Sequence, residues 1–171
     1  MPFDLQPSLA GGLLRLRPLR PEDFGGLYAV ACDPLIWELH PAKDRYKEEV
    51  FTVFFQESLE SGGALIAIDT KDGRVLGSSR FHGYKGQKSE VEIGWTFLAR
   101  SHWGGAYNGE MKQLMLQHAF QFVSRVIFLA GRENFRSQRA LEKIGAVRVG
   151  SRPDSGGHES FVYEIAKPGT L

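Results

Sequence analysis

The stretch HWGGAYNGEMKQLMLQHAF, residues 102–120, constrains the fold of this chain more than any other. It begins with three glycines in eight residues and continues, without glycine or proline, as a run of good helix formers. The residues that follow helical spacing predict one long amphipathic helix: Met111, Leu114, Met115, His118 and Phe122. We interpret His118 as a packed core residue of that helix rather than as a catalyst. Because glycine is a poor helix former, its concentration at the helix start requires a reason.

A strand is expected on either side of this helix. SEVEIGWTFLA, residues 89–99, is the longest strand candidate. Its side chains are expected to alternate between two faces, with Val91, Ile93, Trp95 and Phe97 on one and Glu92, Gly94, Thr96 and Leu98 on the other. VIFLAG, residues 126–131, is uniformly apolar, which is typical of a strand covered on both faces. Strand, helix and buried strand in this order predict a parallel βαβ crossover.

The rest of the chain predicts further strands and helices around this unit. Further strands are predicted at 13–20, 64–69, 75–84, 146–150 and 160–166, and helices at 21–32, 47–61 and 134–145. Residues 33–46 and 151–158 are interpreted as loops. The chain length of 171 residues suits one medium domain.

Charge and cysteine content argue against several classes of protein. Lys and Arg number 21 against 20 for Asp and Glu, so we expect neither a nucleic-acid nor an acidic-membrane partner. The single Cys32 cannot form an internal disulfide, and the five histidines lack a metal-ligand spacing, so no metal is expected. The first twelve residues do not read as a signal peptide, and no apolar run approaches the ~20 residues of a membrane span. We therefore expect a cytoplasmic protein.

The glycine-rich entry to the long helix fits an anion-binding site. The first amides of a helix have no partners within it, and they lie at the positive end of its dipole. Gly104, Gly105 and Gly109 would let the backbone approach an anion, and Asn108 can cap the helix. The alternative is that these glycines serve only a tight turn. Neither a dinucleotide motif nor a P-loop fits the segment, and Glu110 would repel a phosphate unless it points away.

Three stretches in this chain resemble the GNAT superfamily of acyl-CoA-dependent N-acyltransferases: VEIGWTFLARSHWGGAYNGEMKQLMLQHAF, GRENFRSQRALEKIGAVRVG and LLRLRPLRPEDF. The likeness is closest to the branch that includes the acetyltransferases of ribosomal-protein amino termini, and it covers residues 12–166. It implies a single domain over residues 1–171 with an α/β (mixed α+β) fold. The central sheet would be mixed and mostly antiparallel, of about 6–7 strands, with a parallel βαβ unit at its centre and helices on both faces.

The resemblance implies acetyl-CoA as the cofactor, held by the βαβ unit. In this family the first strand of the unit splays from its parallel neighbour, and the pantetheine arm pairs with its exposed edge, here Phe97, Leu98 and Ala99. Loop amides hold the pyrophosphate, which places these residues around it: Gly104, Gly105, Ala106, Tyr107, Asn108 and Gly109. At three positions of the usual loop pattern this chain departs from the family, with Trp103, Ala106 and Asn108.

The following helix would complete the cofactor site. Asn134 matches the asparagine that the family uses beside the pantetheine, and Ser137 occupies the next matched position. From the residues alone, Asn134 is also a good N-cap. Leu141 replaces the tyrosine that many relatives use to protonate the leaving thiolate. Ser137 is therefore the candidate acid by elimination, with His158 and Glu159 as alternatives. Three arginines either meet the ribose phosphate or solvate a helix surface: Arg132, Arg136 and Arg139.

The strand at 89–99 also carries the candidate base. Glu92 can deprotonate an acceptor amine directly or through water, or it is a solvated or salt-bridged strand carboxylate. We interpret Glu90 as such a solvated or salt-bridged carboxylate. His82 and Tyr84 are expected to share one side of their strand and to line the substrate cleft. Trp37 would form an apolar wall of that cleft.

The resulting prediction is an acetyl-CoA-dependent N-acetyltransferase. It would transfer an acetyl group to a primary amine, on a protein N-terminus or a small molecule, by direct attack without an acyl-enzyme intermediate. One alternative is a non-catalytic acyl-CoA-binding regulatory module, which Leu141 supports. Another is transfer of a longer acyl group such as succinyl, for which Arg80 would be the basic residue near the thioester. Family likeness alone suggests a homodimer.

Overall fold

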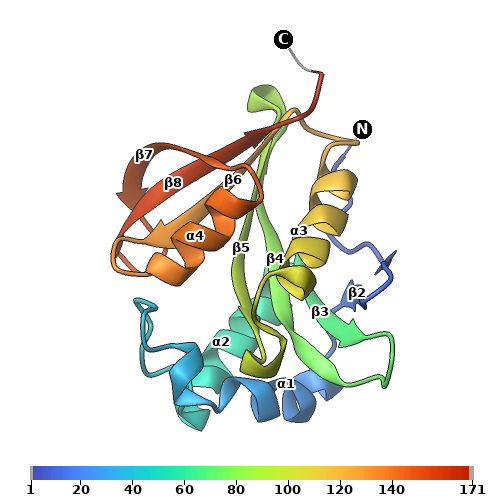
Figure 1. The fold of residues 1–171 in the computed structure, drawn as a ribbon, viewed down its shortest axis with the longest axis vertical. Helices are drawn as coiled ribbons and strands as arrows, with labels where there is room; N and C mark the ends of the chain where they lie inside the picture. Colours follow the sequence, from blue (N-terminus) through green and yellow to red (C-terminus); the bar gives the residue numbers. More distant parts are fainter. Residues whose placement is uncertain (1, 170–171) are drawn as a thin grey trace.

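One eight-stranded sheet runs through the structure, and helices cover both of its faces (Figure 1). The computed structural model describes residues 2–169, so residues 1 and 170–171 of the predicted domain lie outside the described part. The strands are β1 (Leu9–Ala10), β2 (Leu14–Pro18), β3 (Ala64–Asp69), β4 (Val75–Lys85), β5 (Glu90–Leu98), β6 (Arg125–Gly131), β7 (Val147–Pro153) and β8 (Glu159–Ala166). The α-helices are α1 (Phe24–Ala31), α2 (Glu48–Ser61), α3 (Ala106–Ala119) and α4 (Phe135–Lys143).

The strand order is β1-β2-β3-β4-β5-β6-β8-β7, and β5–β6 is the parallel pair among antiparallel neighbours. The mixed, mostly antiparallel sheet with a central βαβ unit is therefore confirmed. The sheet has eight strands instead of about 6–7. The additional strand, β1, pairs only Leu9 and Ala10 with β2, and two residues are too short to leave a periodic pattern in a sequence.

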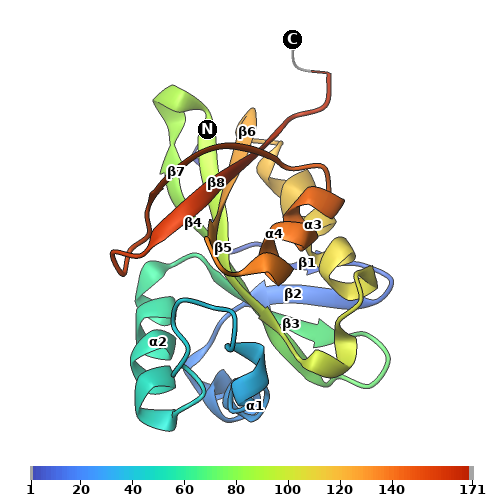
Figure 2. The ribbon, with the colours of Figure 1, turned by 60° about the vertical axis from the view of Figure 1, so that its left-hand side comes forward.

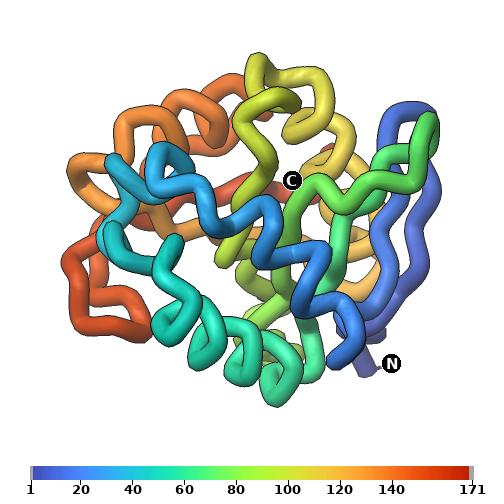
Figure 3. The backbone as a smooth tube through the Cα atoms, turned by 90° about the horizontal axis from the view of Figure 1, so that it is seen from below, coloured from blue at the N-terminus to red at the C-terminus, as the bar shows by residue number. Residues whose placement is uncertain are grey.

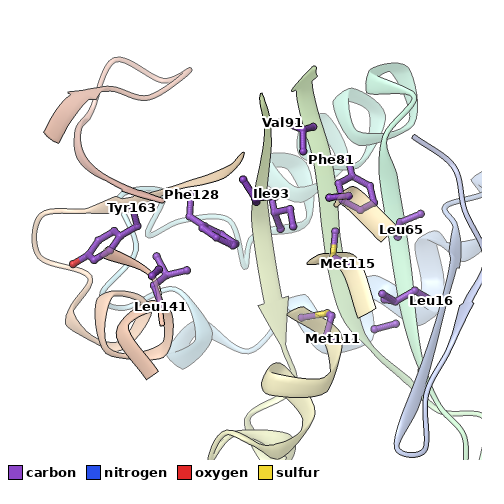
Figure 4. Packing of buried hydrophobic residues seen from close by; sticks show 14 of the residues in the cluster. Leu16, Leu65, Phe81, Val91, Ile93, Met111, Met115, Phe128, Leu141 and Tyr163 are labelled. Atoms are coloured by element: carbon purple, nitrogen blue, oxygen red, sulfur yellow. The ribbon is translucent and has the colours of Figure 1, made fainter. Parts of the chain in front are cut away.

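Two hydrophobic cores lie on opposite faces of the sheet. Figure 3 shows the blue and teal coils of α1 and α2 on one side, and the yellow and orange coils of α3 and α4 on the other. On the α3 side, Met111 and Met115 pack against strand residues such as Leu16, Leu65 and Phe81 (Figure 4), as the predicted helical spacing requires. On the α1–α2 side the core is largely aromatic and aliphatic, and includes Leu27, Phe51, Phe54, Phe55 and Phe97.

The predicted alternation along β5 is wrong in its second half. Trp95 adopts a positive φ of 53°, and the β4–β5 register shifts at the same place, as in a β-bulge. Val91, Ile93 and Leu98 consequently belong to the α3-side core, whereas Trp95 and Phe97 pack with the α1–α2 core. The bulge therefore brings Phe97 to the opposite face of the sheet from Ile93. No pattern in the sequence predicts this bulge.

Other boundaries differ from prediction by small amounts. The helix predicted at 21–32 is divided into a 3-10 turn, Pro21–Asp23, and α1. Asp23 holds that turn, because its carboxylate accepts the Arg20 N–H and pairs with Arg17 at 2.8 Å. β7 extends to Pro153, so the first three residues of the predicted loop 151–158 are in the sheet. Between residues 2 and 169, no helix has the length and apolarity that crossing a bilayer demands.

Candidate active site

The two parallel strands at the centre of the sheet separate along their length (Figures 1 and 2). β5 and β6 pair only at Glu90↔Arg125, Val91↔Val126 and Glu92↔Ile127. Past Glu92, no strand in the described part of the chain pairs with this edge of β5, which is the splay implied by the family resemblance. A cavity of about 1410 Å³ opens there, between the N-terminus of α3 and the loop before α2. Among the three predicted edge residues, Phe97 and Leu98 line this cavity and Ala99 does not; its N–H bonds to Leu76 O of β4.

The N-terminus of α3 points uncapped amides at one end of the cavity. Gly104 and Gly105 adopt φ values of 117° and 111°, a conformation that favours glycine, and α3 begins directly after them. The prediction that Asn108 caps the helix is wrong, because Gly105 is the N-cap residue and offers no side chain. The Gly109 N–H is already bonded to Gly105 O at 2.7 Å. Helix geometry thus leaves the N–H groups of residues 106–108 without intrahelical partners.

Glu110 does not oppose an anion at this end. Its carboxylate accepts the backbone N–H groups of Gly12, Leu13 and Leu14 at 3.0, 2.7 and 2.8 Å. The negative charge therefore fixes the loop before β2 and is turned away from the free amides. The sequence suggested that Glu110 would repel a phosphate bound at the helix start. Its contact with residues 12–14 turns the carboxylate away and removes this repulsion.

Positive side chains gather beside the free amides. A β-carbon at Gly105 would lie 3.1 Å from the Lys143 Nζ, so the end of α4 adjoins this loop. Arg136, which stacks over the Trp103 ring at 4.0 Å, and Arg139 line the cavity as well. Arg132 does not; its guanidinium stacks on Phe161 instead. Sequence reasoning missed Lys143, because nothing in its own helix indicates that the glycine loop lies next to it.

Two of the predicted loop residues face away from the cavity. Tyr107 packs edge-on against His102, with ring centroids 4.7 Å apart, and its hydroxyl donates to Asp69 Oδ2 at 3.3 Å. Ala106 does not line the cavity either, whereas Gly104, Gly105, Asn108 and Gly109 do. Any role of residues 106 and 107 toward an anion is therefore a main-chain role.

The start of α4 forms the wall opposite β5. Asn134 is the N-cap of α4, and its Oδ1 accepts the Ser137 N–H at 3.3 Å. Both residues also line the cavity, so capping and a position beside the cofactor are compatible. Leu141, at the position of the missing tyrosine, is buried in the α3-side core and borders the same cavity. Of the alternative acids, His158 lines the cavity and Glu159 does not.

Glu92 lies buried at the other end of the cavity. Its carboxylate is 3.7 Å from Arg152 Nη2. Burial raises the pKa of Glu92 to about 7, against the opposing effect of Arg152 and Arg80. A carboxylate with this pKa exchanges a proton near neutrality, as a general base must. Glu90, by contrast, is paired with Arg125 at 3.1 Å and does not line the main cavity.

The predicted substrate residues are only partly brought together. Trp37 is buried, donates its indole N–H to Ala31 O at 2.8 Å, and forms a wall of the cavity. His82 lines the cavity and packs edge-on against Trp95, with centroids 5.1 Å apart. Tyr84 does not line it. Gly83, with φ 64°, breaks the alternation between positions 82 and 84, and the Tyr84 ring packs on Phe3 instead.

Lys112 is a functional candidate that sequence reasoning missed. It is 4% exposed on α3, lines the cavity, and donates to Thr96 Oγ1 of β5. Burial lowers the pKa of Lys112 to about 7. The sequence did contain a hint of this role. Lys112 follows Met111 and lies one turn before Met115, so its charge is at the edge of the apolar face of the helix.

These features fit a CoA thioester in two independent ways. Free helix amides next to Lys143, with Arg139 on the wall of the same cavity, suit a pyrophosphate, and the unpaired β5 edge suits an extended arm with amide groups. The cavity volume of about 1410 Å³ accommodates a ligand of that size together with a second substrate.

Residues 14–147 match the sequence model of a family described as the acetyltransferase (GNAT) domain. That match covers most of the chain, and the protein belongs to the GNAT acetyltransferase family. No curated protein sequence matches the chain significantly.

Solved structures share the fold. A GNAT-family acetyltransferase from Bacillus anthracis is 23% identical with a TM-score of 0.76, and the match covers 94% of this chain and 98% of that one. An acetyltransferase from Agrobacterium tumefaciens is 22% identical with a TM-score of 0.74, covering 94% and 95%. Mycobacterium smegmatis RimJ in complex with CoA-disulfide is 19% identical with a TM-score of 0.68, covering 94% and 86%. At these identities the likeness concerns the fold.

Proposed function

We propose that the protein is an acetyl-CoA-dependent N-acetyltransferase that acts on a primary amine by direct attack. One observation carries this proposal: a single cavity joins the uncapped amides of α3 to the buried, near-neutral carboxylate of Glu92 through the gap between β5 and β6. Acyl transfer from a CoA thioester to an amine needs a site that holds the cofactor and a group that deprotonates the amine, and the two ends of this cavity offer both.

Main-chain groups would hold most of the cofactor. The amides of Ala106, Tyr107 and Asn108 would bind its pyrophosphate, with Gly104, Gly105 and Gly109 leaving room for close approach. The edge of β5 at Phe97 and Leu98 would pair with its pantetheine arm, and Asn134 and Ser137 would border that arm from α4. Ala99 was the third residue predicted on this edge, and its N–H bond to Leu76 O of β4 offers no support for that role. When bound, acetyl-CoA supplies an activated acyl group as a thioester.

Glu92 would act as the base. It would take a proton from the acceptor ammonium, directly or through water, and so provide the neutral amine that attack requires. Trp37 and His82 would line the space in which the acceptor is positioned; Tyr84 was the third residue predicted there, and its contact with Phe3 offers no support for that role.

Two groups are candidates to protonate the leaving thiolate. The Ser137 hydroxyl borders the cavity from α4, and the Lys112 ammonium borders it from α3. Lys112 is the stronger acid of the two, because burial brings its pKa to about 7. As an acid on α3, Lys112 would also replace the proton donor that is missing at Leu141 on α4.

The acceptor class is a protein N-terminus or a small-molecule amine, and the resemblance to the acetyltransferases of ribosomal-protein amino termini favours the first. A cytoplasmic location is proposed from the single cysteine, and a homodimer from family likeness.

A thiol-release assay tests the proposal. Acetyl-CoA would be incubated with the protein and a panel of amino-terminal peptides, amino acids and polyamines, and free CoA measured together with binding by calorimetry. We expect binding, and release that depends on at least one amine. Binding without release for every acceptor would favour the non-catalytic module that Leu141 supports, and absence of binding would reject both.

A further inference from the structure

Among residues 2–169, two arginines at the acceptor end of the cavity have no carboxylate within ion-pair distance. Arg80 projects from β4 and is only 6% exposed. Its Nη2 donates to Ser58 Oγ at 2.7 Å, and its guanidinium stacks over Trp95 at 4.3 Å. Its Nε is the one buried side-chain nitrogen or oxygen within residues 2–169 that lacks a hydrogen-bond partner.

Arg45 lies beside it, in the loop before α2. Its guanidinium lies 4.2 Å from the centre of the Phe54 ring and 5.3 Å from that of Trp37, and Arg80 is 5.8 Å from the same Phe54 ring. Within residues 2–169 Arg45 forms neither a side-chain hydrogen bond nor an ion pair. Two cations therefore share one aromatic surface, and both line the cavity.

Nearby acids offset the charge of the pair only in part. Glu57 and Glu92 line the cavity, but neither forms an ion pair with Arg45 or Arg80 in the part of the chain that the structure describes. Burial lowers the pKa of both arginines to about 10. Leaving a buried charge without a partner is costly. Aromatic stacking occupies the faces of these guanidiniums and leaves their edges, which carry the N–H donors, for an anion.

The pair adjoins the proposed base. Arg80 is opposite Gly94 and His82 is opposite Glu92 in the β4–β5 register, so Arg80 and Glu92 are diagonal neighbours. Such neighbours lie about 7–8 Å apart on the same face of a sheet. When the reacting atom of a substrate lies beside Glu92, a second group a few bonds further along the same substrate would therefore reach the two arginines.

We propose that Arg80 and Arg45 bind a carboxylate carried by one of the two substrates. The carboxylate belongs either to the acceptor, as in an amino acid or a peptide with a nearby acidic group, or to the far end of the acyl group, as in succinyl-CoA. A singly charged group suits the site better than a phosphate, because Glu57 already offsets part of the positive charge. This inference rests on the proposed acyl transfer and names a substrate class for it.

Paired probes separate the two sources. For the acceptor, kcat/KM with acetyl-CoA would be compared for a panel of amino acids and for their carboxamides. For the donor, the dissociation constants of succinyl-CoA and acetyl-CoA would be compared by calorimetry. Each measurement would use the wild type, Arg80→Gln and Arg45→Gln. Arg74→Gln is the matched control, since Arg74 is 68% exposed and lies between β3 and β4, outside the cavity lining.

An acceptor carboxylate predicts that Arg80→Gln lowers kcat/KM for the amino acids at least tenfold more than for the carboxamides. A donor carboxylate predicts that it weakens succinyl-CoA binding at least tenfold and leaves acetyl-CoA binding unchanged. Arg45→Gln should act in the same direction, and because Arg45 has no hydrogen bond to lose, it provides the test if Arg80→Gln fails to fold.

Equal effects on charged and uncharged probes, with transfer or CoA-thioester binding intact, would overturn the inference and leave the proposed function standing. If no CoA thioester binds the wild type at all, the proposed function fails, and the carboxylate site fails with it.

Discussion

The two ends of the cavity are built from different parts of the chain. The α3 end consists of main-chain amides that follow Gly104 and Gly105, whereas the acceptor end consists of side chains such as Glu92 and Arg80. Every residue except proline carries the same N–H donor, so a main-chain site tolerates side-chain replacement. A site built from side chains does not tolerate their replacement. We therefore expect the residues of the acceptor end to determine catalysis and substrate specificity.

This contrast explains why departures from the family pattern are compatible with the α3 end. Trp103, Ala106 and Asn108 replace the usual residues, yet α3 starts with its amides free and its negative side chain, Glu110, bonded elsewhere. The loop requires glycine only at positions 104 and 105, where the backbone has a positive φ.

The largest effect is expected at the acceptor end. Glu92→Gln removes the proposed base while keeping the shape of the side chain, and should lower kcat/KM about 100-fold or more at pH 7. Acetyl-CoA affinity, measured by calorimetry, should stay within about twofold, because the α3 end is untouched. Glu90→Gln on the same strand is the control and should keep its turnover. Full activity in Glu92→Gln would remove Glu92 from the mechanism.

A smaller effect should distinguish the two proton donors. Lys112→Met replaces a buried ammonium by an apolar side chain, and we expect kcat to fall about tenfold with little change in folding stability. Ser137→Ala is the matched comparison, measured by steady-state kinetics and thermal unfolding. If Ser137→Ala lowers kcat and Lys112→Met does not, the serine is the acid.

The pH profile should reflect Glu92. Because its pKa is raised to about 7, the base form grows with pH, and with Ser137 as the acid kcat/KM should increase about tenfold between pH 6 and pH 8. With Lys112 as the acid, whose pKa is also about 7, the profile should instead be bell-shaped with a maximum near pH 7. Folding stability should change in the opposite sense. The protonated form is favoured in the folded state, so this contribution is lost as pH rises from about 4.5 to 7. Both trends should flatten in Glu92→Gln; a profile unchanged by the substitution would assign the pKa to another group.

Within the glycine loop at the α3 end, backbone changes should matter more than the loss of a side chain. Gly105→Ala forces a β-carbon onto a residue with φ 111° and toward Lys143 Nζ, and should weaken acetyl-CoA binding several-fold. Asn108→Ala should change the dissociation constant by less than about twofold, because its amide remains. Calorimetry on both variants measures the difference, and a larger loss for Asn108→Ala would mean that its side chain contacts the cofactor.

Local patterns in the sequence predicted much of the fold. Three local features can be read from the sequence because each involves only a few residues. They are the helical spacing of Met111 and Met115, the apolar run of β6, and the conformational freedom of glycine together with the capping ability of asparagine. The βαβ unit, the free helix entry and the capping role of Asn134 follow from them.

The sequence by itself determined that a glycine-led helix would start after a central strand, because backbone conformation there depends on local side chains. Only the tertiary structure decided which charges meet in the cavity: Glu110 bonded to the loop before β2, Lys112 buried against Thr96, and Arg45 beside Arg80. These contacts join residues far apart in the chain, and their burial, which sets their pKa values, exists only once both faces of the sheet are covered.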